Sequence, residues 1–118
     1  DIVEVERIAA SISQFGDEFA KRILATSEME HYLASSIQAR FLAKRFAAKE
    51  AFSKAIGLGM HMPMSWRAMQ TLNEDSGKPV AHYSGLLAQW MAERNWHAQV
   101  TVSDEQEMVI AFVIVSAS

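Results

Sequence analysis

The sequence predicts an α+β domain in which an antiparallel sheet packs against one long helix. Two observations predict this class. Apolar residues recur at helical spacing through the first half of the chain, whereas most of the second half carries strand patterns separated by turn residues. The resulting order is helices, a hairpin, a helix and a second hairpin, which is typical of α+β folds. The chain has 118 residues, enough for a single domain with its own core.

Four helices are expected in the first half of the chain. Gly16 ends the first of them, and Gly57 and Gly59 end the last, because glycine commonly follows a helix. Ser27 and Glu30 have the spacing of a capping box, which predicts Ser27 as the N-cap of the third helix. The expected ranges are residues 2–14, 18–24, 27–34 and 37–56.

Two hairpins and a helix are expected in the second half. Turn residues are dense between Asn73 and Pro79 and again between Ser103 and Glu107, and each cluster predicts the turn of a hairpin. The segment from Met108 to Val115 is apolar without a break, the pattern of a strand covered on both faces. The expected strands are residues 66–72, 80–83, 98–102 and 108–115, and the expected helix is 86–94.

Composition limits the classes of function. The net charge is −3, so no overall basic field favours nucleic acid or a membrane surface as a partner. The chain has no cysteine, which excludes disulfides, thiolate metal sites and cysteine nucleophiles. This fits a reducing compartment, and we expect a cytoplasmic protein. No apolar stretch reaches the roughly 20 residues of a transmembrane helix, and no signal peptide is visible.

An acid and a base lie one turn apart on the long predicted helix. Glu50 and Lys54 are spaced i and i+4, so their head groups share a face, as in many solvated surface pairs. At a rotation of about 100° per residue, Ala43, Ala47 and Gly57 lie near that face. Because these residues are small, they form a strip that leaves room for a ligand. The opposite side holds Phe41, Ala48, Phe52, Ala55 and Ile56.

Four segments in order carry a resemblance that covers nearly the whole chain. They are Asp1–Ile8, Arg40–Ala55, Gly77–Pro79 and Val100–Asp104, the last followed by the apolar run to Val115. Together they resemble the motifs of the holo-acyl-carrier-protein synthases. The resemblance implies one 4′-phosphopantetheinyl transferase domain over residues 1–118. It also implies a homotrimer with active sites at subunit boundaries.

The implied reaction serves fatty acid biosynthesis. Coenzyme A donates its phosphopantetheine arm to a serine of the acyl carrier protein, and adenosine 3′,5′-bisphosphate is released. Asp1 and Glu50 match the family's Mg²⁺ ligands, and Glu50 or a metal-bound water would take the serine proton. Lys54 would neutralise the leaving phosphate. Asp1 has a structural alternative as the N-cap of the first helix.

Further positions match coenzyme A contacts. A basic band is expected beside Glu50, formed by Lys44, Arg45 and Lys49. Either the band is only solvated, or Lys44 or Arg45 binds the 3′-phosphate of coenzyme A. Gly57 would permit close approach of the ligand, or would only end the helix.

The remaining coenzyme A positions lie in the second half of the chain. Lys78 and Pro79 would touch the adenine end, or would belong to an ordinary turn. Gln99 stands where many members have a histidine. His97 lies two residues earlier, on the same face of the predicted strand. It would either partly replace the family's histidine or be an exposed residue at the end of the strand.

Because acyl carrier protein is acidic, we expect this chain to dock it through a basic face. Arg7 matches the family's docking arginine, and Lys21 and Arg22 follow nearby, although all three are also ordinary surface residues. Gln14 stands where relatives often have another basic residue, which predicts a weaker or shifted carrier interface.

The beginning of the chain departs from the family pattern. The family has a short strand before the aspartate that Asp1 matches, and we expect that strand to be missing from this sequence. A different class of function is a non-catalytic trimeric module that binds a nucleotide or a carrier. A hydrolase or a nucleic-acid module ranks third, because the chain lacks a Ser/His/Asp order, a zinc spacing and a basic aromatic surface.

Overall fold

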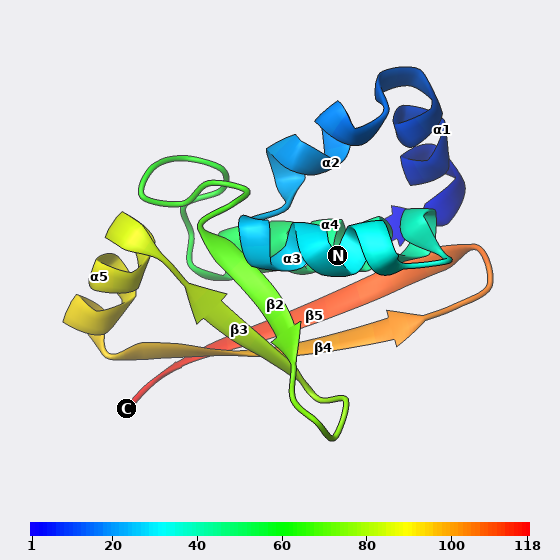
Figure 1. The fold of residues 1–118 in the computed structure, drawn as a ribbon. Coiled ribbons are helices and arrows are strands. Elements are labelled where there is room, and N and C mark those ends of the chain that lie inside the picture. The colour runs from blue at the N-terminus through cyan, green and yellow to red at the C-terminus, as the bar shows by residue number, and fades with distance from the viewer.

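The long helix α4 (Gln38–Ala55) runs through the middle of the computed structural model, which describes residues 1–118. An antiparallel sheet in the order β1-β5-β4 packs on one side of α4, and a separate two-stranded sheet pairs β2 with β3 (Figure 1). This confirms the predicted α+β class. The strands are β1 (Ile2–Glu4), β2 (Met69–Asn73), β3 (Pro79–Tyr83), β4 (Trp96–Asp104) and β5 (Met108–Ala117).

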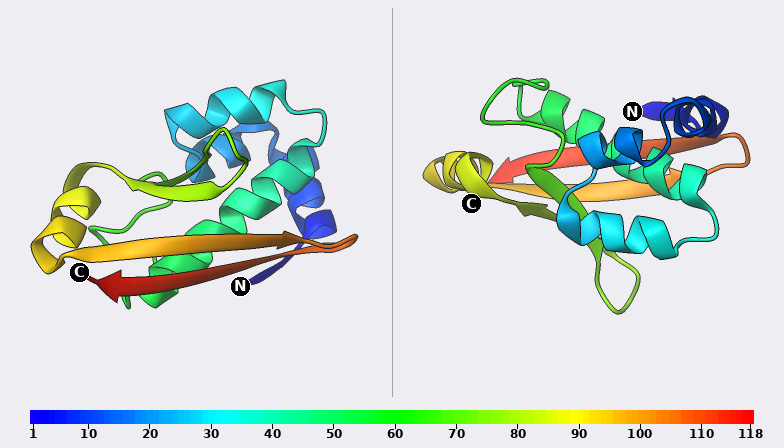
Figure 2. Two further views of the ribbon diagram at one scale, coloured as in Figure 1. Left: turned by 90° about the horizontal axis from the view of Figure 1, so that it is seen from below. Right: turned by 45° about the horizontal axis from the view of Figure 1, so that its top comes forward.

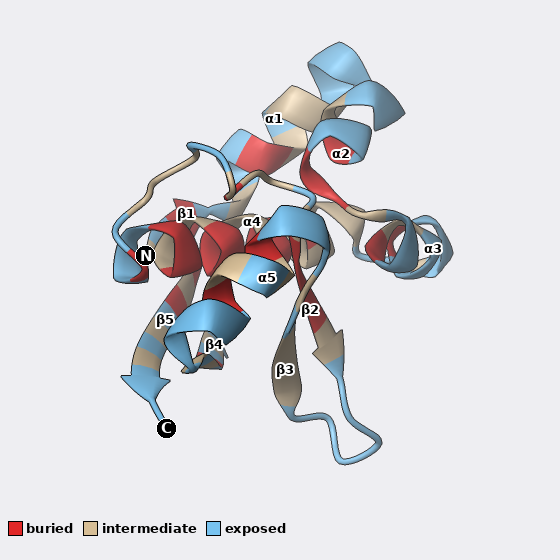
Figure 3. Cartoon of the chain, turned by 90° about the vertical axis from the view of Figure 1, so that its left-hand side faces the viewer, coloured by how far each residue is buried: buried red, intermediate tan, exposed pale blue.

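The helices α1 (Val5–Phe15) and α3 (Thr26–Ala34) and the strand β2 also pack against α4. Figure 2 shows β4 and β5 on one side of α4 and α3 on the other. The buried residues gather along α4 and the parts of the sheet that face it (Figure 3). None of the helices has both the length and the hydropathy that a transmembrane span requires. The shorter helices are α1 (Val5–Phe15), α2 (Asp17–Ile23), α3 (Thr26–Ala34) and α5 (Gly85–Arg94).

The start of the chain is a strand, so the predicted helix from Ile2 was wrong over its first three residues. Ile2 pairs with Ile110, and Glu4 pairs with Met108, at the edge of the sheet. The helical spacing of apolar residues begins only at Val5, where α1 starts. A short strand therefore follows Asp1.

The third helix begins earlier than the capping-box pattern predicted. Its N-cap is Ala25, and the side chain of Glu28 accepts a hydrogen bond from the Ala25 backbone N–H at 3.0 Å. Ser27 is an exposed residue of the first turn, so its assignment as the N-cap was wrong. The cap is displaced because the carboxylate of Glu28 is buried against α4 and not presented to solvent.

A buried ion pair joins α3, α4 and β2. Lys49 Nζ donates to Glu28 Oε1 at 2.7 Å, to the Trp66 carbonyl at 2.7 Å and to the Met69 carbonyl. Burial lowers the pKa of Lys49, and the charge of Glu28 opposes that shift. The predicted strand from Trp66 starts only at Met69, because residues 66–68 form a turn that presents its first carbonyl to this ammonium.

The core face predicted for α4 is largely confirmed, because Ala48, Phe52 and Ile56 are buried, but the open strip predicted on the other face is not observed. Ala43 and Ala47, expected to lie beneath a ligand, are fully buried in the core, whereas Ala55, expected on the core side, is exposed. The reason is that α4 is enclosed on both sides, by the sheet and by α3 and β2. Its alanines therefore allow close packing within the chain, and the predicted open strip was wrong.

The last strand is covered on one face in the single chain. Val109 and Ala111 are buried, whereas Phe112 and Ile114 are 63% and 54% exposed. The prediction of a strand covered on both faces was therefore wrong for an isolated chain. The uncovered face is nevertheless apolar, and Ile2 adds to it from β1 at 64% exposure.

Candidate active site

Asp1 and Glu50, which are far apart in the sequence, line one cavity of about 390 Å³. β1 and α1 form much of its wall, with Arg7 among the lining residues, and Phe19 of α2 and Phe46 of α4 add aromatic surface. The cavity therefore combines three carboxylates, those of Asp1, Glu4 and Glu50, and a guanidinium with apolar walls. Such a mixture of a few polar groups in apolar surroundings is typical of ligand sites.

Backbone pairing holds Asp1 in place. The Ala111 N–H donates to the Asp1 carbonyl at 2.8 Å, and the Asp1 nitrogen donates to the Ala111 carbonyl. The side chain of Asp1 is only 18% exposed. It does not cap α1, because the N-cap is Glu4 and no side-chain cap is formed. The alternative reading of Asp1 as an N-cap was therefore wrong.

Lys54 brings a cation to the same group of residues. Its Nζ lies 2.7 Å from Asp1 Oδ1, and its side chain is 65% exposed. The sequence pattern offered Glu50 as the surface partner of Lys54, but in the structure the partner is Asp1. The ammonium thus lies beside the first carboxylate and one helical turn from Glu50, while most of its surface remains available to an anion.

The carboxylates fit a Mg²⁺ site that a substrate completes. No group of three or more His, Cys, Asp or Glu side chains is arranged to hold a metal alone. Mg²⁺ is commonly held by one or two carboxylates together with waters and substrate phosphates. Asp1 and Glu50 in one cavity supply that donor set. They would hold the ion together with a phosphate-bearing ligand.

The predicted basic band beside Glu50 is not a surface feature. Lys49 is fully buried, and Arg45 is also buried, with its Nε 3.8 Å from Glu28 Oε2 and its guanidinium over the Phe41 ring. The assignment of Arg45 to the 3′-phosphate therefore loses its basis within one chain. Helical spacing could not show that α3 delivers a carboxylate to this side of α4. Lys44 is the partly exposed member of the three.

Lys44 belongs to a cluster with the β4–β5 turn. Its Nζ lies 2.8 Å from Asp104 Oδ2, and the Arg40 guanidinium donates to Asp104 Oδ1. Arg40 also donates to the carbonyls of Glu105 and Gln106, at 2.6 Å in each case. The cluster ties the start of α4 to this turn. The sequence patterns gave Arg40 and Asp104 no role of their own, because no local spacing relates two residues so far apart in the chain.

This cluster makes the stability depend on pH. Burial alone would raise the pKa of Asp104, but hydrogen bonds from Lys44 and Arg40 outweigh it and hold the pKa below its usual value. The stabilisation is therefore present above about pH 4, the ordinary pKa of aspartate, and is lost as the pH falls through the lower folded-state pKa. We expect Asp104→Asn to cost about 1 kcal/mol at pH 7, reduced by solvent screening, and progressively less below about pH 4. Urea unfolding across this range measures the cost, and an equal cost at every pH would contradict the assignment.

The other predicted coenzyme A contacts lie outside the cavity of the single chain. Gly57 follows α4 with φ of +82°, a backbone conformation that glycine adopts readily, in keeping with its role in ending the helix. Lys78 and Pro79 belong to the β2–β3 turn, which projects away from α1 (Figure 1). Gln99 is exposed and pairs with Ile114, and His97 Nε2 lies 2.9 Å from Ser118 Oγ.

The predicted docking residues divide between two places. Arg7 lines the cavity beside the carboxylates. Lys21 and Arg22 are exposed on α2, and Lys21 is 3.5 Å from Glu18 in a largely solvated pair. Glu4 and Ser11 also line the cavity, although the sequence patterns did not single them out.

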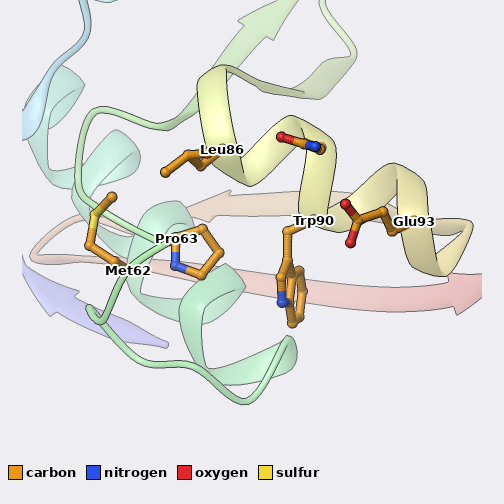
Figure 4. A pocket seen from close by; sticks show the side chains of 6 residues that line it. Met62, Pro63, Leu86, Trp90 and Glu93 are labelled. Carbon is orange, nitrogen blue, oxygen red and sulfur yellow. The ribbon is translucent and has the colours of Figure 1, made fainter.

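A second hollow of about 400 Å³ lies between α5 and the Met62–Pro63 segment (Figure 4). Leu86 and Trp90 of α5 face it, and Glu93 is its only charged lining residue. It contains none of the predicted site residues. The predicted site residues Asp1, Arg7 and Glu50 line the first cavity instead.

The comparisons with known proteins agree with this fold. Residues 1–113 match the family model described as the 4′-phosphopantetheinyl transferase superfamily. The chain belongs to this superfamily. It is 57% identical to the holo-[acyl-carrier-protein] synthase of Polynucleobacter asymbioticus, over 98% of this chain and 93% of that protein. It is 53% identical to the synthase of the same name from Herminiimonas arsenicoxydans, over 98% and 92% of the two chains.

Solved structures of the same name have the same fold. The crystal structure of the Neisseria meningitidis holo-[acyl-carrier-protein] synthase superimposes with a TM-score of 0.94 at 38% identity, over 98% of this chain and 94% of that chain. The Helicobacter pylori synthase in complex with coenzyme A gives a TM-score of 0.85 at 27% identity, over 98% and 96% of the two chains. The family resemblance found in the sequence motifs is confirmed.

Proposed function

We propose that this chain transfers the 4′-phosphopantetheine group of coenzyme A to a serine of an apo acyl carrier protein. The observation that carries the proposal is the cavity shared by Asp1 and Glu50, with Lys54 bonded to Asp1. The names of its relatives, and coenzyme A in one similar structure, support the same substrates. The products are the holo carrier protein and adenosine 3′,5′-bisphosphate.

The chain's own residues account for charge and proton transfer in this reaction. The serine oxygen forms a bond to the phosphorus next to the pantetheine arm, and the bond from that phosphorus to the bridging oxygen of the diphosphate breaks. Glu50 accepts the serine proton, and Lys54 neutralises charge on the departing phosphate. Asp1 and Glu50 would hold Mg²⁺, which would supply further charge neutralisation to the diphosphate oxygens.

A mass measurement separates transfer from binding alone. The protein is incubated with coenzyme A, Mg²⁺ and an apo carrier protein, and the carrier is then examined by mass spectrometry. We expect the carrier to gain the mass of one phosphopantetheine arm. Coenzyme A binding without any gain of mass would instead support the non-catalytic binding module.

The carrier is expected to dock beside the cavity through Arg7. A charge reversal, Arg7→Glu, should raise the KM for the acidic carrier about tenfold or more, while coenzyme A binding stays unchanged. Steady-state kinetics and calorimetry measure the two effects. Arg94→Glu on α5 is a matched control that should change neither. An equal loss of carrier and coenzyme A affinity in Arg7→Glu would count against a docking role.

The active form is proposed to be a homotrimer with active sites at subunit boundaries. Ile2, Phe112 and Ile114 leave an apolar face of the sheet uncovered, which a second chain would bury. A neighbouring chain would also be needed to bring Lys78, Pro79 and Gln99 to a cavity that they do not reach in their own chain. Sedimentation equilibrium should give the mass of three chains, and a monomer at micromolar concentration would contradict this arrangement.

The cytoplasm is the proposed compartment. The chain has no cysteine that an oxidising compartment would pair, and none of its helices has the features of a transmembrane span. Cell fractionation followed by immunoblotting tests this location.

A further inference from the structure

Lys49, the residue next to Glu50 in the sequence, is held by an unusually complete set of polar contacts. Its ammonium group is fully buried and donates to the Glu28 carboxylate, the Trp66 carbonyl and the Met69 carbonyl. An ammonium group has three N–H donors, so all of them are used. The acceptors come from α3, from the turn before β2 and from the start of β2.

The partner of Lys49 is held equally firmly. Glu28 is also fully buried, and besides Lys49 it accepts hydrogen bonds from the Ala25 N–H at 3.0 Å and the Thr71 N–H at 3.2 Å. Arg45 adds a second cation at 3.8 Å. The position of Glu28 is therefore fixed by the backbone of α3 and of β2, and not only by Lys49.

Polar contacts add directional restraint to the apolar packing of α4. Leu42 and Phe52 are fully buried and pack in the core, whereas Ala43, Ala47 and Ala48 have short side chains that interlock little with their neighbours. Hydrophobic contact is non-directional, whereas hydrogen bonds require a particular direction. Glu50 projects about 100° around the helix from Lys49. Fixing the direction of Lys49 therefore also fixes the direction of Glu50.

We propose that Glu28 and Lys49 are positioning residues that hold Glu50 toward the cavity it shares with Asp1. Neither Glu28 nor Lys49 lines that cavity, so neither contacts the substrate. The inference rests on the proposed transfer function, because Glu50 is assigned there as proton acceptor and metal ligand. Glu28 and Lys49 act through the orientation of α4.

A double variant tests the pair without leaving either the Glu28 carboxylate or the Lys49 ammonium buried and unpaired. Glu28→Gln combined with Lys49→Met removes both charges at nearly constant volume. We expect a folded protein whose kcat falls about 10- to 100-fold, as for a small misplacement of a catalytic group. The KM values for coenzyme A and the carrier should stay unchanged, and the Mg²⁺ concentration for half-maximal activity should rise. Met91→Ala, a core truncation in α5 away from the pair, should lower stability without lowering kcat.

A crystal structure of the double variant supplies a readout independent of activity. The expected result is a Glu50 side chain that has left its place in the cavity wall. A folded double variant with wild-type kcat and an unmoved Glu50 would overturn the inference. Glu28→Asp, which keeps the charge and withdraws the carboxylate by one methylene, is a milder second variant judged by the same two readouts. A wild-type protein that leaves the carrier unmodified would instead overturn the proposed function, and the position of Glu50 in the variants would still report on the pair.

Discussion

Glu50→Gln is expected to lower kcat for phosphopantetheine transfer by about 10³-fold or more, which corresponds to about 4 kcal/mol of lost transition-state stabilisation. The amide has nearly the same size as the carboxylate but neither accepts the serine proton nor carries a negative charge for a divalent cation. Glu50 lies in a cavity wall and forms no ion pair in the chain, so its loss should not disturb folding. Single-turnover kinetics at saturating coenzyme A measure the chemical step directly.

A control variant separates this effect from a general loss of charge. Glu30→Gln removes an exposed carboxylate of α3 that does not line the cavity, and its kcat should match that of the wild-type protein. Circular dichroism spectra of both variants should superimpose on the wild-type spectrum. A correctly folded Glu50→Gln protein with full activity would remove Glu50 from the reaction.

Lys49→Met is expected to lower the free energy of unfolding by about 3–5 kcal/mol, because the buried Glu28 carboxylate loses its hydrogen-bonded cation and keeps only Arg45 at 3.8 Å. The melting temperature should fall by roughly 10–20 °C for a domain of this size. Guanidinium unfolding monitored through the tryptophans measures the change. The loss is large because the Trp66 and Met69 carbonyls lose their donor at the same time.

The second substitution in the pair distinguishes a buried charge from ordinary packing. When Glu28→Gln is added to Lys49→Met, part of the lost stability should return, because the poorly paired Glu28 charge disappears, although the Trp66 and Met69 carbonyls still lack their donor. Lys21→Met, at a lysine that is 60% exposed, should change stability by no more than about 0.5 kcal/mol. A Lys49→Met protein as stable as the wild type would show that the ammonium is not buried in solution.

Local patterns predicted much of the fold. Helical spacing from Val5 onward and the glycines after α4 gave the main helices, and turn residues gave both hairpins. The errors lie where distant residues decide the structure. Ile2–Glu4 forms a strand because β5 is available to pair with it. Ser27 is not the cap of α3 because Glu28 turns inward to Lys49.

The candidate site was predicted from motifs, and its geometry was not. Spacing within one helix related Glu50 to Lys54, but it could not show that Lys54 bonds Asp1, which lies just before β1. In the same way, a run of basic residues on α4 gave no sign that Lys49 and Arg45 point into the protein. Their direction depends on a carboxylate from α3, and hydrophobic periodicity carries no information about it.

The central claim is that Asp1 and Glu50 together hold a divalent cation against the diphosphate of coenzyme A. A crystal structure of the protein with coenzyme A and Mn²⁺, read through the anomalous scattering of the metal, tests it most directly. The expected result is one anomalous peak in contact with both carboxylates and with a diphosphate oxygen. A metal bound to neither carboxylate, with the diphosphate outside this cavity, would contradict the claim.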